Sequence, residues 1–478
     1  MRADCHVCRS EGLAPRARVL LTAGSREVFA TLFQIDDHWL GPDEAGLSES
    51  AWRRLGVKAG DHITARHPPT VDSLADVRRR IHGHRLHARA FQGIIADIVA
   101  GRYVDIDLAT FITACSALPL DRDEMVHLTR AMVDTGERLH WNVPIVIDKH
   151  CVGGLPGNRT TPIVVAIVAA LGLIMPKTSS RAITSPAGTA DAMETLAPVD
   201  LDLPLMRRVV ESEGGCLAWG GTVRLSPADD ILIRIERAID IDTEGQMVAS
   251  ILSKKLAAGS THVIIDIPVG RTAKVRTKAA ARSLAENLVA VAATIGLKLR
   301  CVLTDGTQPV GRGIGPALEA RDVVLVLTNA PNAPQDLRER ALLLAGAALE
   351  LAGAADEGSG RDLADTVLSD GRAWTKFQRI CAAQGGMRTP PVAALTRVWT
   401  SHRAGSIGGF DNRRISRLAK LAGAPDDAAA GLDLHVRLGD TVVAGSPLVT
   451  IHAESHGEMA YALEYLAAND DMIEIRAR

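Results

Sequence analysis

The sequence predicts a multidomain α/β protein built around a mostly parallel sheet that helices cover. Its 478 residues are enough for roughly two to four domains. Hydrophobic residues make up 47% of the chain but aromatic residues only 3%, so the core is aliphatic, which suits buried parallel strands. Between about residues 144 and 386, short aliphatic runs alternate with Ala-rich helical stretches.

Two smaller domains are predicted before and within this central region. Residues 1–84 are expected to form an N-terminal β domain. Residues 85–145 are expected to be helical, because apolar side chains recur there at helical spacing. Residues 228–258 also have a helical pattern that interrupts the α/β alternation, and we assign them to the same helical domain. The strand-like runs of the β domain are 18–21, 27–30 and 62–65.

The central α/β domain is predicted to comprise residues 146–227 and 259–385 and to bind phosphate. A long helix is expected at 279–295. The aliphatic runs interpreted as strands are 145–147, 173–175, 263–265, 300–303 and 323–326.

Residues 386–478 are predicted to form a C-terminal α+β domain. Arg437–Val449 has the pattern of a β hairpin with Gly-Asp and Gly-Ser-Pro turns, and it is similar to the hammerhead turn of lipoyl and biotinyl carrier domains. No lysine stands at the turn where such carriers attach their cofactor. A structural or oligomerisation role is therefore expected for this hairpin.

Charge and cysteine usage exclude several classes of function. The 54 Lys and Arg nearly balance the 56 Asp and Glu, which argues against binding nucleic acid through bulk charge. Seven cysteines without framework spacing indicate a reducing compartment, and the Cys5–Cys8 CxxC lacks the second pair of a zinc finger. The longest apolar run, Ile163–Met175, is shorter than the roughly 20 residues of a membrane helix. We expect a cytoplasmic protein with no metal, nucleic-acid or membrane partner.

The segment around Asp148-Lys149-His150 carries the strongest functional signal. A strand ends in these residues, a glycine-rich loop follows, and Thr161 and Pro162 are expected to open a helix as N-cap and N1. Glycine N–H groups, the helix N-terminus and Lys149 together favour a phosphate cradle. An ordinary strand-to-helix turn is the alternative, but the nearby cations, including Arg159, favour the anion site. The Walker A pattern is absent.

A similar arrangement recurs about thirty residues later. The strand at 173–175 runs into the hydroxyls and cations of Lys177–Arg181, and Ser185 and Pro186 are expected to open a helix as N-cap and N1. In a parallel sheet both loops emerge at the carboxyl edge, where ligands bind. Two such loops favour a dianion site, although capping of the helix is an alternative use for the hydroxyls.

A third group follows the predicted helical excursion. Asp242, Ser250 and Lys254 are spaced by eight and four residues, so one helical face can hold a carboxylate, a hydroxyl and an ammonium. A solvated charged face is the alternative. Lys274 follows the strand at 263–265 and is expected at the same carboxyl edge.

Together these segments resemble the pyrimidine-nucleoside and AMP phosphorylase family from about Ser73 onward. The N-terminal extension, the Pro156-Gly157-Asn158 insertion and Lys177–Ser185 are similar to the AMP phosphorylase subgroup. The matching motifs are Asp148-Lys149-His150-x-x-Gly153-Gly154, Ser180-Arg181, Ala187-Gly188-Thr189, Ala249-Ser250-Ile251-Leu252-Ser253-Lys254-Lys255 and Gly311-Arg312.

The resemblance implies phosphorolysis of a nucleoside 5′-monophosphate, with thymidine phosphorolysis as the close alternative. It implies inorganic phosphate as co-substrate, no cofactor, a homodimer or higher oligomer, and an α domain and an α/β domain that close over a cleft. A phosphoribosyltransferase of the anthranilate type is a remoter alternative. Such enzymes need Mg²⁺ carboxylates near the pyrophosphate, and these loops carry no paired acidic motif.

The resemblance also implies roles for single residues. Lys149, Thr161, Ser180 and Thr189 would hold phosphate, and Asp242 would donate the proton. Lys149, His150, Arg181 and Asp242 form the expected catalytic set, and Arg159, Lys177 and Lys274 would suit a 5′-phosphate. The expected substrate site is lined by Gly154, Ser180, Arg181, Ala182, Ile183, Thr184, Ser185, Thr189, Asp242, Ser250, Lys254 and Lys274.

Two residues depart from the family pattern. Cys151 stands where the family usually has Ser, and a thiol is the weaker hydrogen-bond donor. Ile235 falls where thymidine phosphorylases have the arginine that grips the pyrimidine. The second departure favours a base that is larger or held differently.

Overall fold

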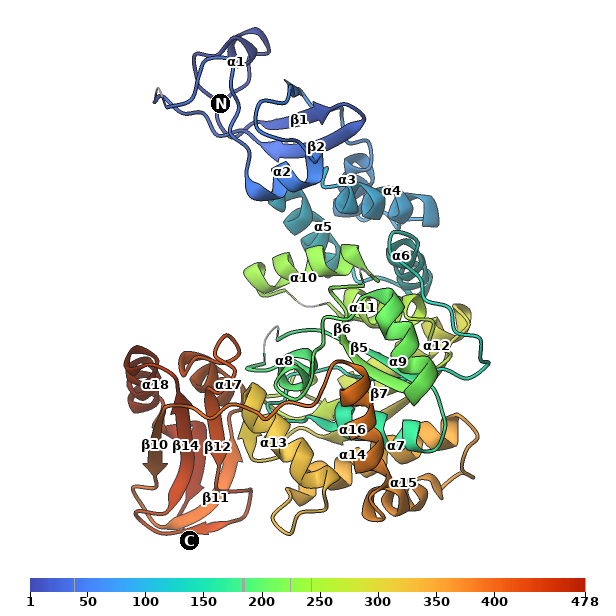
Figure 1. The fold of residues 1–478 in the computed structure, drawn as a ribbon, viewed down its shortest axis with the longest axis vertical. Coiled ribbons are helices and arrows are strands. Elements are labelled where there is room, and N and C mark those ends of the chain that lie inside the picture. Colours follow the sequence, from blue (N-terminus) through green and yellow to red (C-terminus); the bar gives the residue numbers. More distant parts are fainter. Residues whose placement is uncertain (38, 183–184, 224, 242, 478) are drawn as a thin grey trace. The chain divides into compact units, whose positions relative to one another are not determined.

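The structure is a computed structural model, which describes residues 1–37, 39–182, 185–223, 225–241 and 243–477. It divides into two compact units (Figure 1). The first unit comprises Met1–Leu120 and Pro227–Thr243, and the second comprises Asp121–Ser226 and Glu244–Arg478. The finer domain limits expected from the sequence stay a prediction.

The first unit begins with a small antiparallel sheet of strand order β2-β1-β3. Alternating side chains of its strands, including Val19, Leu21 and Val28, are buried against the short helices α1 and α2. The three strands predicted in this region are confirmed. The elements are α1 (His6–Ser10), β1 (Arg18–Ala23), β2 (Arg26–Thr31), α2 (Glu49–Leu55) and β3 (Thr64–Arg66).

The rest of the first unit is helical, as predicted. Helix α10 comes from far along the chain and packs on α4 and α5, where Arg234 pairs with Asp105 at 2.6 Å. The helices are α3 (Leu74–Ile81), α4 (Ala88–Val99), α5 (Asp105–Ala117) and α10 (Pro227–Ile239).

The second unit contains the predicted parallel sheet. Strands β4, β7 and β8 pair in parallel, as do β5 and β6, and a parallel bridge between Val146 and Ile174 sets β4 beside β5. The strands therefore follow the order β6-β5-β4-β7-β8. Their bounds are β4 (Ile147–Cys151), β5 (Met175–Ser179), β6 (Gly215–Trp219), β7 (His262–Val269) and β8 (Lys298–Asp305). Strand β6 is not among the strands predicted from the sequence.

Helices surround this sheet (Figure 1). Helix α7 is apolar on every face because it lies inside an extensive hydrophobic core, in contact with α13, α14, α15 and α16. The helices are α6 (Arg122–Asp134), α7 (Thr160–Ala170), α8 (Thr189–Glu194), α9 (Leu203–Glu213), α11 (Glu244–Ala257), α12 (Lys278–Thr294), α13 (Pro316–Leu327), α14 (Gln335–Leu351), α15 (Gly360–Ser369) and α16 (Arg372–Ala383).

The strand predicted at 323–326 is wrong, because these residues form the end of helix α13. Pro316 occupies the first turn of this helix, a position that suits the ring because the first N–H groups have no helical partner. Val323 and Val326 are fully buried on its core-facing side. Tertiary burial therefore overrides the strand preference of the valines.

The C-terminal part holds two antiparallel sheets, of order β10-β14-β12-β9 and β13-β11-β15. The predicted β hairpin at 437–449 is wrong in its pairing, because β13 pairs with β11 whereas β14 pairs with β10 and β12. The turn at Gly445-Ser446 thus carries the chain from one sheet to the other. The elements are β9 (Gly313–Ile314), β10 (Leu395–Thr400), β11 (Gly405–Phe410), α17 (Asn412–Leu421), β12 (Gly431–Leu434), β13 (Thr441–Val442), β14 (Pro447–Ala453), α18 (His456–Ala468) and β15 (Ile473–Arg476).

The seven cysteines are all free thiols. The Cys5 sulfur accepts a hydrogen bond from the Cys8 backbone N–H at 3.3 Å, so Cys5 caps helix α1. Within the part of the chain that the structure describes, no helix has the length and apolar character needed to cross a membrane.

Candidate active site

Lys149 is the middle residue of β4 and directs its ammonium at the start of helix α7. Its Nζ is 2.8 Å from Thr160 Oγ1 and 3.4 Å from Thr161 Oγ1. The side chain is nearly inaccessible, and burial lowers the Lys149 pKa. Because an ammonium can only donate, each threonine oxygen accepts from it and keeps its own proton for another acceptor. Thr160 joins this set although the sequence pointed only to Thr161.

Helix α7 begins earlier than predicted. Its first residue is Thr160 and its N-cap is Arg159, so Thr161 and Pro162 lie inside the first turn and are not N-cap and N1. The N-cap makes no side-chain capping hydrogen bond. The Thr160 and Thr161 N–H groups are among those that an α-helix leaves without a helical partner, and the helix dipole places positive potential beside them.

Arg159 joins this helix start to the second loop. Its Nη1 lies 2.6 Å from Thr189 Oγ1, and its Nη2 lies 2.9 Å from the Ala187 carbonyl oxygen. On the other side, Nε lies 2.7 Å from Glu319 Oε2. This ion pair argues against the expected binding of a second phosphate by Arg159, because the buried Glu319 carboxylate already compensates the Arg159 charge.

The second loop is braced by Arg181. Its guanidinium pairs with Glu194 at 2.5 Å and Asp191 at 3.3 Å and lies over the Trp219 ring, 4.8 Å from the centroid. Hydrogen bonding to Glu194 raises the Arg181 pKa further. Ser180 is exposed beside this brace. Arg181 thus contacts carboxylates of the loop's own helix, and its catalytic role stays a prediction.

Helix α8 also begins elsewhere than predicted. It starts at Thr189 with Gly188 as N-cap, so Ser185 and Pro186 lie in the loop before it and are not N-cap and N1. The Asp191 carboxylate accepts from the backbone N–H groups of Ala182 at 2.6 Å and Gly188 at 2.7 Å, which closes the loop onto the helix start. Ile183 and Thr184, predicted to line the substrate site, lie outside the described residues.

Asp148 of β4 forms a buried triad with two lysines. Asp148 is 2.8 Å from Lys255 Nζ and 3.1 Å from Lys177 Nζ, and all three side chains are nearly inaccessible. Burial alone would raise the Asp148 pKa, but the two ammonium groups hold it below its usual value. Burial also lowers the Lys255 pKa to about 7. Lys177 therefore pairs inside the protein, contrary to its expected use for a 5′-phosphate.

The same triad anchors helix α11 to the sheet. Lys255, one of the two lysines that pair with Asp148, belongs to α11. Ser250 and Lys254, both predicted to line the substrate site, lie one turn apart on the same helix. Burial and the nearby Lys255, Lys177 and Lys254 charges hold the His150 pKa well below its usual value, so the imidazole is neutral at neutral pH. Asp242, the expected proton donor, lies outside the described residues.

The glycine loop packs directly on the segment that carries Lys274. Gly154 has φ +78°, and a Cβ there would lie 2.4 Å from the Lys274 backbone nitrogen. Only glycine allows this approach. Cys151 accepts a hydrogen bond from Asn158 Nδ2 at 3.3 Å, and burial raises its pKa to about 12. The thiol is thus protonated at neutral pH.

Two acids of this region are not among the residues that the sequence predicts for the site. Glu319 and Asp148 are each 1% exposed, and each compensates cations that the sequence marked as ligands for phosphate. In the sequence, Asp148 stands out only as part of the Asp148-Lys149-His150 motif. Helix α13 also carries Arg321 and Asp322, so no local signal in the sequence distinguishes Glu319 as the buried partner of Arg159.

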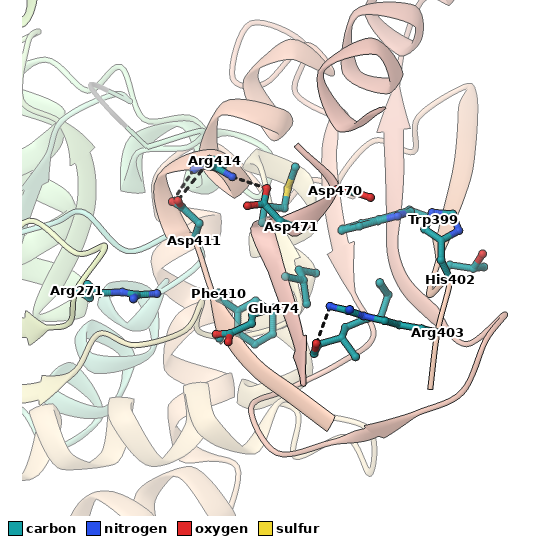
Figure 2. A pocket seen from close by; sticks show the side chains of 16 residues that line it. Arg271, Trp399, His402, Arg403, Phe410, Asp411, Arg414, Asp470, Asp471 and Glu474 are labelled. Carbon is teal, nitrogen blue, oxygen red and sulfur yellow. Dashed lines mark hydrogen bonds and ion pairs between the residues drawn. The ribbon is translucent and has the colours of Figure 1, made fainter. Parts of the chain in front are cut away.

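A cavity of about 640 Å³ lies in the C-terminal part (Figure 2). Arg414 pairs there with Asp411 and Asp471. Arg271, in the loop after β7, also lines the cavity. Its lining does not include Lys149, Ser180 or Thr189. This cavity is therefore not the candidate active site, which is defined by the side-chain contacts at the edge of the parallel sheet. Among the described residues, no group of three His, Cys, Asp or Glu side chains could hold a metal ion.

The α/β domain that contains this candidate site is that of a glycosyltransferase. Residues 143–374 match the family described as "Glycosyl transferase family, a/b domain". Residues 406–472 match "Pyrimidine nucleoside phosphorylase C-terminal domain". The chain belongs to the thymidine and pyrimidine-nucleoside phosphorylase family, and it is a pentosyltransferase of the nucleoside phosphorylase type, as the sequence predicts.

Full-length relatives support this assignment. A Chelativorans sp. (strain BNC1) protein named "Putative thymidine phosphorylase" is 63% identical over 478 residues, which cover 100% of this chain and 94% of the relative. A protein of the same name from Tolumonas auensis is 62% identical over 99% of this chain and 94% of its own length. One from Legionella pneumophila (strain Corby) is 54% identical over 99% and 92%.

Solved structures share the fold at low identity. The anthranilate phosphoribosyltransferase of Thermus thermophilus has a TM-score of 0.55 and 19% identity, covering 64% of this chain and 98% of that one. The Saccharomyces cerevisiae enzyme, in complex with PRPP and Mg, has a TM-score of 0.53 and 15% identity, covering 65% and 97%. These likenesses concern the fold alone.

Proposed function

We propose that this enzyme cleaves thymidine with inorganic phosphate and releases thymine and 2-deoxyribose 1-phosphate. The observation that carries the proposal is the set of hydroxyls oriented by cations at the sheet edge: Lys149 donates to Thr160 and Thr161, and Arg159 donates to Thr189. Each hydroxyl keeps a proton to donate to an anion. The names of the full-length relatives favour thymidine as the nucleoside.

The state of the cations favours a substrate with no 5′-phosphate. Arg159 is paired with buried Glu319 and Lys177 with buried Asp148, so two of the three cations expected to bind a second phosphate are already compensated. A second dianion would have to compete with these carboxylates in a region of low dielectric constant. Thymidine carries no such charge.

In the proposed mechanism, phosphate is both nucleophile and counter-charge. Lys149, Thr161, Ser180 and Thr189 would hold it beneath C1′, where positive charge develops as the glycosidic bond breaks. His150 is neutral because burial and the charges of Lys255, Lys177 and Lys254 hold its pKa well below the usual value, so it adds no positive charge to this part of the protein. The protonated Cys151 thiol is a poor nucleophile, which agrees with direct attack by phosphate.

Asp242 is proposed to protonate the departing base nitrogen. A carboxyl group can do this near neutral pH only if its pKa is raised in a closed, drier site. Asp242→Asn should therefore lose most turnover, and near-wild-type turnover would show that this role is wrong.

Cleavage of a nucleoside 5′-monophosphate is the second candidate. Ile235, 4% exposed on α10, falls where the family resemblance expects an arginine that grips the pyrimidine of thymidine. An apolar side chain at this position favours a base held in another way. For either substrate, we also propose that the enzyme is a homodimer or a larger homo-oligomer, as the family resemblance implies.

One assay distinguishes these candidates. The purified enzyme is incubated with thymidine, other nucleosides or nucleoside monophosphates, with and without inorganic phosphate, and free base is measured. We expect thymine release that needs phosphate, is insensitive to EDTA and is lost in Lys149→Gln. Release of adenine from AMP without release of thymine would favour the second candidate, and activity abolished by EDTA would favour a metal-dependent transferase.

A further inference from the structure

A buried ion pair connects helix α13 with the two loops of the candidate active site. Glu319 is 1% exposed in α13, and its Oε2 lies 2.7 Å from Arg159 Nε and 2.5 Å from Nη2. Its other oxygen, Oε1, accepts from the Gly315 N–H at 3.1 Å. Both carboxylate oxygens are therefore fixed, and they hold one edge of the guanidinium.

The opposite edge of that guanidinium lies at the start of two helices. Arg159 immediately precedes α7, while its Nη1 and Nη2 donate to Thr189 Oγ1 and the Ala187 carbonyl at the start of α8. The guanidinium is planar and rigid, so the carboxylate that fixes one edge also fixes the donors on the other.

This contact decides which way the Thr189 hydroxyl can donate. Thr189 Oγ1 accepts from Arg159 at 2.6 Å, and a guanidinium has no acceptor to offer in return. The single hydroxyl proton must therefore point away from Arg159. A dianion held by Lys149 and Ser180 is an acceptor of that kind.

We propose that Glu319 is a positioning residue for the phosphate site, which acts through Arg159 to orient the Thr189 hydroxyl toward inorganic phosphate. This inference rests on the proposed function, in that phosphate is taken as the ligand of Thr189. Glu319 also compensates the Arg159 charge, so the guanidinium stays turned toward Thr189 when an anion enters. Burial raises the Glu319 pKa to about 7 and the Arg159 charge opposes that rise, which makes its ionised state depend on this partner.

Single and double neutral variants test the proposal. Glu319→Gln should raise the KM for phosphate about tenfold, the effect of losing about 1.4 kcal/mol, with the KM for thymidine changed less than about twofold. Arg159→Gln should do the same. Because Glu319 acts through Arg159, the double variant should have the phosphate KM of Arg159→Gln alone and not the product of both effects.

The double variant also keeps the test informative if a single variant fails to fold. A single change leaves one buried charge uncompensated, which destabilises proteins strongly, whereas removing both charges is often tolerated. Asp322→Asn is the matched control, since Asp322 is a buried carboxyl of the same helix that accepts from the backbone N–H groups of Arg312 and Gly313. Its phosphate KM should stay within about twofold of wild type.

Two results would overturn the proposal. One is a folded double variant with a wild-type phosphate KM, and the other is an equal rise of both KM values in Glu319→Gln. A thermal-shift titration with inorganic phosphate separates this proposal from the proposed function. If the wild type releases no base but phosphate raises its melting temperature, and the double variant loses this shift, the proposed function fails while the positioning role stands.

Discussion

The β4–α7 and β5–α8 loops have the same sequence plan and use their cations differently. Each runs from a buried strand through a cation and hydroxyls into a helix. Across the first loop, Lys149 of β4 donates to the hydroxyls of Thr160 and Thr161 at the start of α7. In the second, Arg181 pairs with Glu194 and Asp191 of the helix that follows.

The position of the nearest carboxylates accounts for this difference. The acid beside Lys149 in the sequence is Asp148, but adjacent strand residues point to opposite faces, and Asp148 pairs with Lys177 and Lys255. Lys149 therefore donates to the hydroxyls and not to Asp148, although the buried Asp266 is close enough for its charge to oppose the lowering of the Lys149 pKa. Arg181 meets carboxylates on its own helix and becomes a brace. A cation in such a loop therefore indicates a ligand site only after its acids are located.

The largest expected effect concerns Asp148, whose side chain lies on the face of β4 opposite to that of Lys149. Asp148→Asn leaves two ammonium groups buried together, and we expect the free energy of unfolding to fall by about 3–5 kcal/mol. Chemical denaturation measures this change. Asp471→Asn, which breaks an exposed pair with Arg414, should cost less than about 1 kcal/mol. Equal losses in the two variants would contradict the role of the buried triad.

The next effect tests the first loop as the phosphate site. Lys149→Gln removes the cation that orients two hydroxyls, and we expect kcat/KM for phosphate to fall about 100-fold or more. Steady-state kinetics with thymidine in excess measures it. A decrease below about threefold in a correctly folded variant would mean that phosphate binds elsewhere.

A smaller effect concerns pH and the histidine of the first loop. His150 has a folded-state pKa well below the unfolded value of about 6.5, so the unfolded chain binds a proton first as pH falls. Its contribution to stability is present above about pH 6.5 and is lost below it by up to about 1.4 kcal/mol per pH unit. Unfolding measured from pH 8 to 5.5 should show a steeper loss in wild type than in His150→Gln. Parallel profiles would contradict a buried neutral imidazole.

The smallest effect on phosphate binding is expected in the second loop. Arg181→Gln removes the partner of Glu194 and should lower thermal stability, while the KM for phosphate changes less than in Lys149→Gln. Glu194→Gln is the matched control and should produce a similar loss of stability. A phosphate KM raised as much by Arg181→Gln as by Lys149→Gln would erase the distinction between the two loops and support the predicted catalytic role of Arg181.

Much of the fold could be predicted because local patterns determine it. The three N-terminal strands, the helix at 278–294 and four of the five parallel strands follow from short aliphatic runs, helical spacing and turn residues. The valines at 323–326 misled because periodicity cannot tell a short buried helix segment from a strand. The hairpin prediction failed because a turn sequence does not determine which sheet each flanking strand joins.

By itself, the sequence determined which loops combine glycines, hydroxyls and cations between a strand and a helix, since these are local features, and it predicted that these loops carry the chemistry. The tertiary structure decided which cations remain for a ligand. Glu319 reaches Arg159 and Lys255 reaches Asp148 across more than a hundred residues of chain. Charge compensation depends on distance in space and on burial, and neither can be obtained from the spacing of residues along the chain.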